Sequence, residues 1–206
     1  MFKTITPIDN TILLERDYDS SKIEQTITNS IIAQKSWSKL EIKERVSLLE
    51  NFVKEFLSKE EIIKEELTRQ IGRPISQTIN ELKGFKERAD HMLSIASKKL
   101  SNISLNRGDN FDNYIVRKAL GVAFIIAPWN YPYLTSVNSI IPAMAAGNTV
   151  ILKHSAQTPL CAEQLFAAAK KTLPKNIFNY LHLNHEDSLK VISDKRVNFV
   201  SFTGSV

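Results

Sequence analysis

The second half of this sequence alternates short apolar runs with helix-length segments, and no other feature restricts the fold as strongly. The runs occupy residues 122–127, 149–153, 177–181 and 198–202, and the segments between them occupy residues 132–146, 159–172 and 186–193. Such alternation is typical of parallel strands joined by crossover helices. The pattern therefore predicts an α/β fold with a Rossmann-like, largely parallel, doubly wound sheet.

The first half of the chain predicts helices instead. Residues 4–17 indicate a short hairpin, and apolar side chains then recur at helical spacing in four segments that extend to residue 100. The polar residues 101–113 indicate a loop or boundary, and residues 114–117 a further strand. We therefore divide the chain into an amino-terminal hairpin with helices, residues 1–112, and a partial Rossmann-like sheet, residues 113–206.

Composition excludes several classes of protein. The 27 Lys and Arg residues exceed the 22 Asp and Glu residues by only five and form no dense basic block, which argues against a nucleic-acid partner. The longest apolar run, residues 122–129, is far shorter than the roughly 20 residues of a membrane helix, and no secretory signal is visible. We therefore expect no membrane association.

The few metal-ligating and sulfur-bearing residues also limit the possibilities. Cys161 is the only cysteine, so an internal disulfide is impossible and a reducing, cytoplasmic setting fits best. His182 and His185 have no nearby cysteine or clustered carboxylates, and we interpret them as ordinary residues at a strand end. We expect no metal site.

Polar residues follow three of the predicted strands at their carboxyl ends. Asn130 stands in a short turn between two prolines after the first strand, Lys153 ends the second, and Gly204 and Ser205 follow the fourth. Because the carboxyl ends of parallel strands share one edge of a sheet, we expect these groups to converge there. A carboxamide, a cation and a small-residue turn suit an anionic, nucleotide-like ligand.

Each residue type has a chemical use at such an edge. Lys153 supplies a charge and three donors for ribose hydroxyls or a phosphate. Gly204 permits a close backbone approach and, with Ser205, offers donors to a diphosphate. Asn130 is placed to aim its amide at a developing oxyanion. These are also common turn residues at strand ends, and that alternative stays open for each of them.

Several motifs, in order and spacing, resemble the aldehyde dehydrogenase superfamily. They are Leu120-Gly121-Val122, Ala127-Pro128-Trp129-Asn130-Tyr131-Pro132, Ile141-Pro142-Ala143-Met144-Ala145-Ala146-Gly147-Asn148-Thr149-Val150-Ile151-Leu152-Lys153, Gln157-Thr158-Pro159-Leu160, Leu173-Pro174 and Val200-Ser201-Phe202-Thr203-Gly204-Ser205. The resemblance implies a variant sheet that binds NAD or NADP without a glycine fingerprint. The six glycines of this sequence indeed form no G-x-G-x-x-G motif.

The resemblance also implies roles for individual residues. Asn130 would be the catalytic oxyanion-hole amide, and Lys153 would contact the adenosine ribose or its 2′-phosphate. Gly204 and Ser205 would begin the diphosphate-binding turn, and Trp129 would line the cofactor cleft. In the family, a cysteine thiolate attacks the aldehyde, hydride passes to nicotinamide, and a glutamate-activated water releases the acid.

The sequence departs from the family pattern at several points. The family's nucleophilic cysteine and general-base glutamate follow the Phe-Thr-Gly-Ser turn and are not found here, nor are the catalytic domain and the strand that completes the family's homo-oligomer. We expect Cys161 to be a buried thiol that cannot replace the nucleophile. Ala156 stands where NAD-preferring members commonly carry a glutamate, so NADP should be tolerated. His154 replaces a frequent proline, and we expect it at the surface.

The leading hypothesis is a truncated NAD(P)-dependent aldehyde dehydrogenase, incomplete at its carboxyl end and inactive alone, whose full-length form would oxidise a small-molecule aldehyde. Two alternatives stay open: a non-catalytic nucleotide-binding module, or one half of a split enzyme. The sequence does not predict which aldehyde is the substrate.

Overall fold

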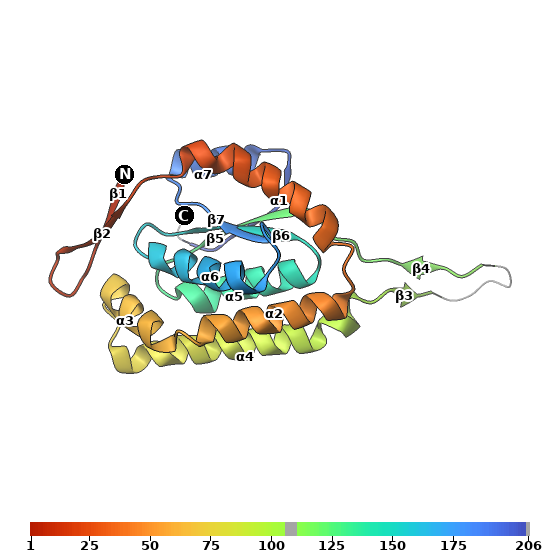
Figure 1. The fold of residues 1–206 in the computed structure, drawn as a ribbon, viewed down its shortest axis with the longest axis horizontal. Helices are drawn as coiled ribbons and strands as arrows, with labels where there is room; N and C mark the ends of the chain where they lie inside the picture. The colour runs from red at the N-terminus through yellow and green to blue at the C-terminus, as the bar shows by residue number, and fades with distance from the viewer. Residues whose placement is uncertain (106–110, 205–206) are drawn as a thin grey trace.

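A four-stranded parallel sheet in the order β7-β6-β5-β8 forms the centre of the computed structural model, which describes residues 1–105 and 111–204 (Figure 1). The strands are β5 (Val122–Ala127), β6 (Thr149–His154), β7 (Phe178–Tyr180) and β8 (Val197–Phe202). All four predicted strands are confirmed. The chain extends the sheet from β5 to β6 and β7, then returns to add β8 on the opposite side of β5. The order in which the chain adds strands therefore reverses between β5 and β8. Doubly wound folds bind their ligands beside such a reversal, which is called the switch point.

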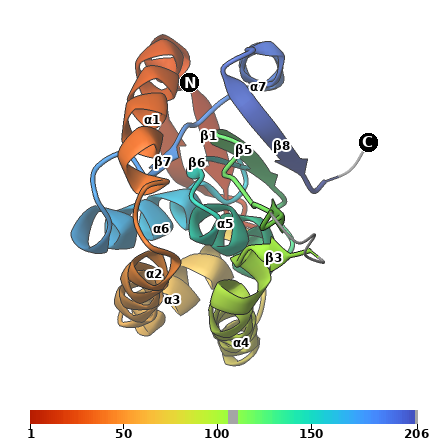
Figure 2. The same ribbon diagram turned by 90° about the vertical axis from the view of Figure 1, so that its right-hand side faces the viewer.

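Helices cover both faces of this sheet. α5 (Pro132–Ala145) and α6 (Pro159–Thr172) pack on one face, while α1 (Ile23–Trp37) and α7 (His185–Ser193) lie over the other (Figure 2). β5 and β6 are buried along their whole length because both of their faces are covered. The predicted doubly wound arrangement is confirmed.

Three amino-terminal helices form an outer layer against α5 and α6. They are α2 (Ile42–Leu57), α3 (Glu60–Ile71) and α4 (Ile75–Leu100). α3 ends at Gly72, which adopts a left-handed φ of 72° that glycine tolerates better than other residues. The sharp turn that follows lets α4 start against α5.

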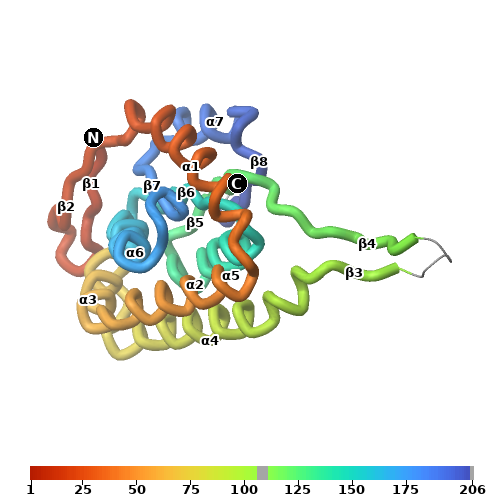
Figure 3. Tube along the Cα trace, turned by 45° about the vertical axis from the view of Figure 1, so that its right-hand side comes forward, coloured from red at the N-terminus to blue at the C-terminus, as the bar shows by residue number. Residues whose placement is uncertain are grey.

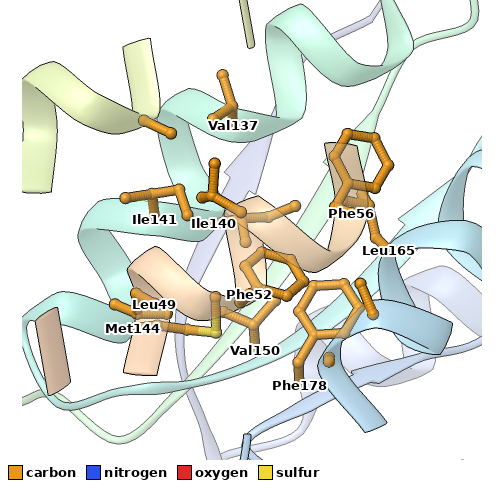
Figure 4. Close-up of a cluster of buried hydrophobic side chains, with 14 of the residues drawn as sticks. Leu49, Phe52, Phe56, Val137, Ile140, Ile141, Met144, Val150, Leu165 and Phe178 are labelled. Carbon is orange, nitrogen blue, oxygen red and sulfur yellow. The ribbon is translucent and has the colours of Figure 1, made fainter. Parts of the chain in front are cut away.

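The outer helices and the sheet share one hydrophobic core. Phe52 of α2 meets Phe178 of β7 with ring centroids 6.0 Å apart, and Phe56 meets Tyr133 of α5 at 5.0 Å. Leu165 of α6 lies in the same cluster (Figure 4). The two segments 1–112 and 113–206 are therefore packed through a continuous apolar interior.

Two hairpins lie outside these layers. β1 (Phe2–Ile5) pairs with β2 (Ile12–Arg16), as the sequence predicts, and the short 3₁₀ turn η1 (Ser20–Lys22) leads into α1. β3 (Ile103–Ser104) pairs with β4 (Tyr114–Ile115) in an arm that projects from the body (Figures 1 and 3).

The arm corrects one expectation. The predicted loop at 101–113 contains a strand, because Ile103 and Ser104 pair with the strand expected at 114–117, which itself stays outside the main sheet. Residues 106–110 of that loop lie outside the described residues. Of the helices described, none has the length and continuous apolar character needed to cross a membrane.

Candidate functional site

A cleft of about 590 Å³ opens at the carboxyl edge of the sheet, beside the point where the strand order reverses. Its walls come from the loop after β5, the end of β6, the start of α7 and the turn after β8. Trp129, Asn130, Lys153 and Gly204 all line it. The fifth predicted site residue, Ser205, lies outside the described residues.

The cleft forms here because β5 and β8 run parallel and end side by side. The backbone N–H of Thr203 donates to the carbonyl of Ile126 over 3.0 Å, so the turn after β8 is tied to the end of β5. After β5 the chain turns toward α5, on one face of the sheet, and after β7 it turns toward α7, on the other face. Residues from both of these connections line the cleft, which lies beside the point where the strand order reverses.

Asn130 lines this space, and the acceptor end of its carboxamide is used within its own loop. The backbone N–H of Tyr131 donates to Asn130 Oδ1 over 3.0 Å, which occupies the acceptor end of the carboxamide. In the described part of the chain, no acceptor takes the hydrogens of Asn130 Nδ2. The side chain is therefore oriented as a donor, which is the chemistry that a developing oxyanion requires.

Lys153 is a largely buried cation that lines the cleft and has no counter-ion among the described residues. The residue is only 9% exposed, and no carboxylate or acceptor among residues 1–105 and 111–204 pairs with its ammonium group. Burial lowers the pKa of Lys153 below its usual value. A buried charge is unfavourable unless it is paired, so this ammonium favours a ligand that brings negative charge into the cleft.

Trp129 and Gly204 form the outer part of the site. Trp129 is 53% exposed at the mouth of the cleft. Gly204 does not adopt a left-handed φ, but a Cβ at this position would come within 3.0 Å of the Phe202 ring. The small size of Gly204 therefore matters for the space around it and not for its backbone conformation.

His154 corrects an expectation, because the structure buries it. Only 2% of the residue is exposed, and neither ring nitrogen has a hydrogen-bond partner among the described residues. Burial, with smaller contributions from Lys153 and His182, lowers the pKa of His154 from 6.5 to about 3. The imidazole is therefore neutral near pH 7 and adds no positive charge to the site. Its position on an internal strand with both faces covered explains the burial.

Cys161 lies away from the cleft, as the sequence predicts. It is fully buried on α6 within the core shared with α2 and α5, and Gln70 Nε2 lies 4.0 Å from its sulfur. Burial raises the pKa of the Cys161 thiol well above its usual value. A neutral, enclosed thiol is a poor nucleophile.

Other residues of the cleft were given no role in the sequence analysis. Thr135, Ser155, His185 and Thr203 also line it. His185 is exposed as the first residue of α7 and is not the ordinary strand-end residue that we expected. Asn130 and Lys153 were predicted because they stand at the carboxyl ends of strands. His185 could have been found in the same way, because it is the first residue of the helix that follows β7.

No metal site is found within the part of the chain that the structure describes. No group of three or more His, Cys, Asp or Glu side chains is arranged there to hold an ion. His182 instead contacts Glu163, with 3.0 Å between Nε2 and Oε1, and its backbone N–H donates to Asp19 over 2.8 Å. These contacts tie the segment after β7 to α6 and to Asp19, directly before η1, and give His182 a structural environment.

The sheet order and the cleft at its switch point define a doubly wound α/β domain of the Rossmann-like class, whose cleft is lined by a cation that no described residue pairs. Comparison with known proteins identifies the family to which this domain belongs. The model of the aldehyde dehydrogenase family matches residues 1–206, and the chain belongs to that family.

Individual relatives agree with this assignment. The chain is 28% identical over 215 residues to a protein of Sinorhizobium fredii described as a probable succinate-semialdehyde dehydrogenase (NADP+), covering 99% of this chain and 42% of the relative. Among solved structures, PnpE in complex with nicotinamide adenine dinucleotide superposes with a TM-score of 0.92 at 23% identity, covering 99% of this chain and 42% of that one. Succinic semialdehyde dehydrogenase of Streptococcus pyogenes in complex with NADP+ superposes with a TM-score of 0.86 at 23% identity, with coverages of 97% and 44%. The chain therefore spans less than half the length of these relatives.

Proposed function

We propose that the cleft binds NAD or NADP and that these 206 residues form the cofactor-binding part of an NAD(P)-dependent aldehyde dehydrogenase. The observation that carries this proposal is the largely buried Lys153, which no described residue pairs, in the same cleft as the Asn130 carboxamide, whose acceptor end is already used. Membership of the family and the likeness to structures solved with NAD and NADP support it.

The residues present fit such a cofactor. Lys153 would hold the adenosine ribose or its 2′-phosphate, and Gly204 with Ser205 would begin the turn that holds the diphosphate. Trp129 would form one wall. When bound, the nicotinamide would supply a hydride acceptor for aldehyde oxidation. The side-chain amide of Asn130 would donate to the aldehyde oxygen as it becomes an oxyanion. The other residues named here would bind and orient the cofactor.

The nucleophile would have to come from residues beyond these 206. Cys161 is the only cysteine and is enclosed on α6, so the cleft itself presents no thiol. We therefore propose that this stretch alone does not oxidise aldehydes. The same observation supports the second candidate function, a module that binds the dinucleotide without turning it over, either by itself or as one half of a split enzyme.

The cleft should accept NADP at least as well as NAD. None of the described residues that line it is an Asp or Glu. Ala156, at the position where a ribose-binding glutamate is common in the family, is exposed, and its carbonyl accepts from Thr4 Oγ1 over 2.7 Å. Without a carboxylate there, the 2′-phosphate meets no repulsion and gains the Lys153 charge.

Equilibrium dialysis of the 206-residue chain with NADP and with NAD tests the proposal. We expect saturable binding of both, lost in Lys153→Met and kept in Lys170→Met, which removes an exposed lysine far from the cleft. NADPH formation with aldehydes should stay at background. Absence of saturable binding would reject the proposed function, whereas turnover by the chain alone would reject its restriction to cofactor binding.

A further inference from the structure

The loop that carries Asn130 is held from outside the sheet by an ion pair. We infer that Arg73 and Glu81, from the turn before α4 and from α4 itself, are positioning residues that fix the orientation of the Asn130 carboxamide. The inference rests on the proposed function, since it explains how the donor end of that amide is kept available to the cleft. Arg73 lies 57 positions before Asn130 in the sequence, and Glu81 lies 49 positions before it.

Glu81 anchors the far side of the loop. Its side chain is fully buried, and Oε1 accepts from the backbone N–H groups of Tyr133 and Leu134 at 2.8 Å and 3.3 Å. These groups belong to the first turn of α5, which has no capping side chain of its own. A carboxylate at a helix N-terminus satisfies those donors and interacts favourably with the helix dipole. Glu81 therefore fixes where α5 begins, directly after the loop.

Arg73 links Glu81 to the loop itself. One guanidinium nitrogen donates to Glu81 Oε2, and the other donates to the backbone carbonyl of Asn130. The guanidinium carbon also lies 4.4 Å from the centre of the Tyr131 ring. The planar fork of arginine suits such simultaneous contacts, because its donors have fixed relative directions. Glu81 therefore holds Arg73, and Arg73 in turn contacts Asn130 and Tyr131.

Asn130 and Tyr131 form the hydrogen bond that orients the Asn130 carboxamide. The Tyr131 N–H donates to Asn130 Oδ1, while Arg73 contacts the Asn130 carbonyl and the Tyr131 ring. If Arg73 is removed, both ends of that short segment lose their external restraint. The carboxamide can then rotate, and its Nδ2 donors no longer point to one place.

A merely structural role for the pair predicts something different. In that case Glu81 would stabilise α5 and Arg73 would only neutralise Glu81, with no effect confined to Asn130. Burial raises the pKa of Glu81 above its usual value even with Arg73 present, so the carboxylate depends on its partners. The two roles are separated by measuring the loop and the helix in the same sample.

The test uses Arg73→Met, with Arg88→Met as the matched control. Arg88 lies on α4 and donates to Leu134 O of α5 over 3.2 Å, but forms no hydrogen bond with the loop in the described part of the chain. Glu81→Gln provides a second, isosteric variant that keeps an acceptor for α5 and removes the charge. Two-dimensional NMR of the chain without cofactor reports the Asn130 side-chain NH₂ signals, assigned through Asn130→Asp, and hydrogen exchange at the Tyr131 amide.

In Arg73→Met we expect roughly tenfold faster exchange at Tyr131, the order produced by losing a charge-assisted hydrogen bond, and broadened or shifted Asn130 NH₂ signals. Amides in the middle of α5 should keep their protection. Glu81→Gln should give a smaller change of the same kind, and Arg88→Met none. Unchanged Asn130 signals in both Arg73→Met and Glu81→Gln, or equal loss of protection through α5, would overturn the inference. Titrating NADP into the wild-type sample keeps the proposals distinct, because failure to bind rejects the proposed function and leaves the positioning result intact.

Discussion

The backbone N–H of Tyr131 donates to the side-chain oxygen of Asn130 over 3.0 Å. This contact uses the acceptor end of the carboxamide within the loop and, among the described residues, leaves its donors available to a ligand. Lys153 lies in the same cleft as a second group that needs a partner. One neutral donor and one cation at the switch point of the sheet are the basis of the predictions that follow.

Replacing Lys153 should make the chain more stable and a weaker binder at once. A buried ammonium without a counter-ion is unfavourable, so Lys153→Met should raise the free energy of unfolding by about 1 kcal/mol near neutral pH. The sign follows from the lowered pKa, because the unfolded state binds the proton more tightly than the folded state does. Urea denaturation measures the change. A fall in stability of similar size would show that Lys153 has a partner in the folded chain.

His154 should make the chain sensitive to mild acid. Its pKa falls from 6.5 to about 3 on folding, so between these values the unfolded state takes up a proton that the folded state excludes. Stability from this group is present above pH 6.5 and is lost as the pH falls, by about 2 kcal/mol between pH 7 and pH 5.

The variant His154→Leu isolates this contribution. It should flatten the pH dependence of the unfolding free energy over that range, while His91→Gln, at an exposed histidine, should leave the wild-type curve unchanged. Urea titrations at pH 7 and pH 5 provide the comparison. Equal pH dependence in wild type and His154→Leu would mean that the imidazole is protonated in the folded protein.

Gly121 should be intolerant of any side chain. It adopts a φ of 137°, and an added Cβ would lie 2.0 Å from Asn198 Oδ1, which accepts from the backbone N–H of Val122 at 2.9 Å. Gly121→Ala should therefore lower the unfolding free energy by about 2 kcal/mol, through backbone strain and loss of that hydrogen bond. In the Asn198→Ala background the same substitution should be less harmful, because only the strain remains. Equal effects in the two backgrounds would rule out the contact with Asn198.

Ala156 should influence the choice between the two dinucleotides. Ala156→Glu introduces a carboxylate three residues after Lys153, at the position of the family's ribose-binding glutamate, where it would repel a 2′-phosphate and accept from ribose hydroxyls. We expect NADP affinity to fall roughly tenfold or more, with NAD affinity kept or improved, since like charges at an interface are strongly disfavoured. Parallel dialysis with both cofactors measures the ratio. An unchanged ratio would place the 2′-position away from residue 156.

The sequence pattern predicted the strands and the helices that cover them because apolar period and length are local properties. The same reasoning placed Asn130, Lys153 and Gly204 at one edge, and the cleft now contains all three. It was wrong for His154, because a polar residue at the end of a strand gives no sign that both faces of that strand are covered.

Long-range contacts lay beyond the reach of this reasoning. Glu81 contacts the first turn of α5, and Arg73 contacts the loop that carries Asn130. Both contacts depend on how α4 packs against α5, which covers the sheet. The spacing of apolar residues in α4 and in α5 does not indicate how these two helices pack together. The short arm strands were obscured in a similar way, since Ile103 and Ser104 stand in a polar segment and become a strand only by pairing with Tyr114 and Ile115.

The central claim is that the dinucleotide binds at the switch point between β5 and β8. Mapping amide and indole NMR shifts during an NADP titration tests it most directly. We predict that the Trp129 indole, the Asn130 side-chain NH₂ and the backbone amides of Thr203 and Gly204 shift together with one saturation curve. Shifts confined to the separate cavity around Phe166 and Pro174, or no saturable shifts at all, would contradict the claim.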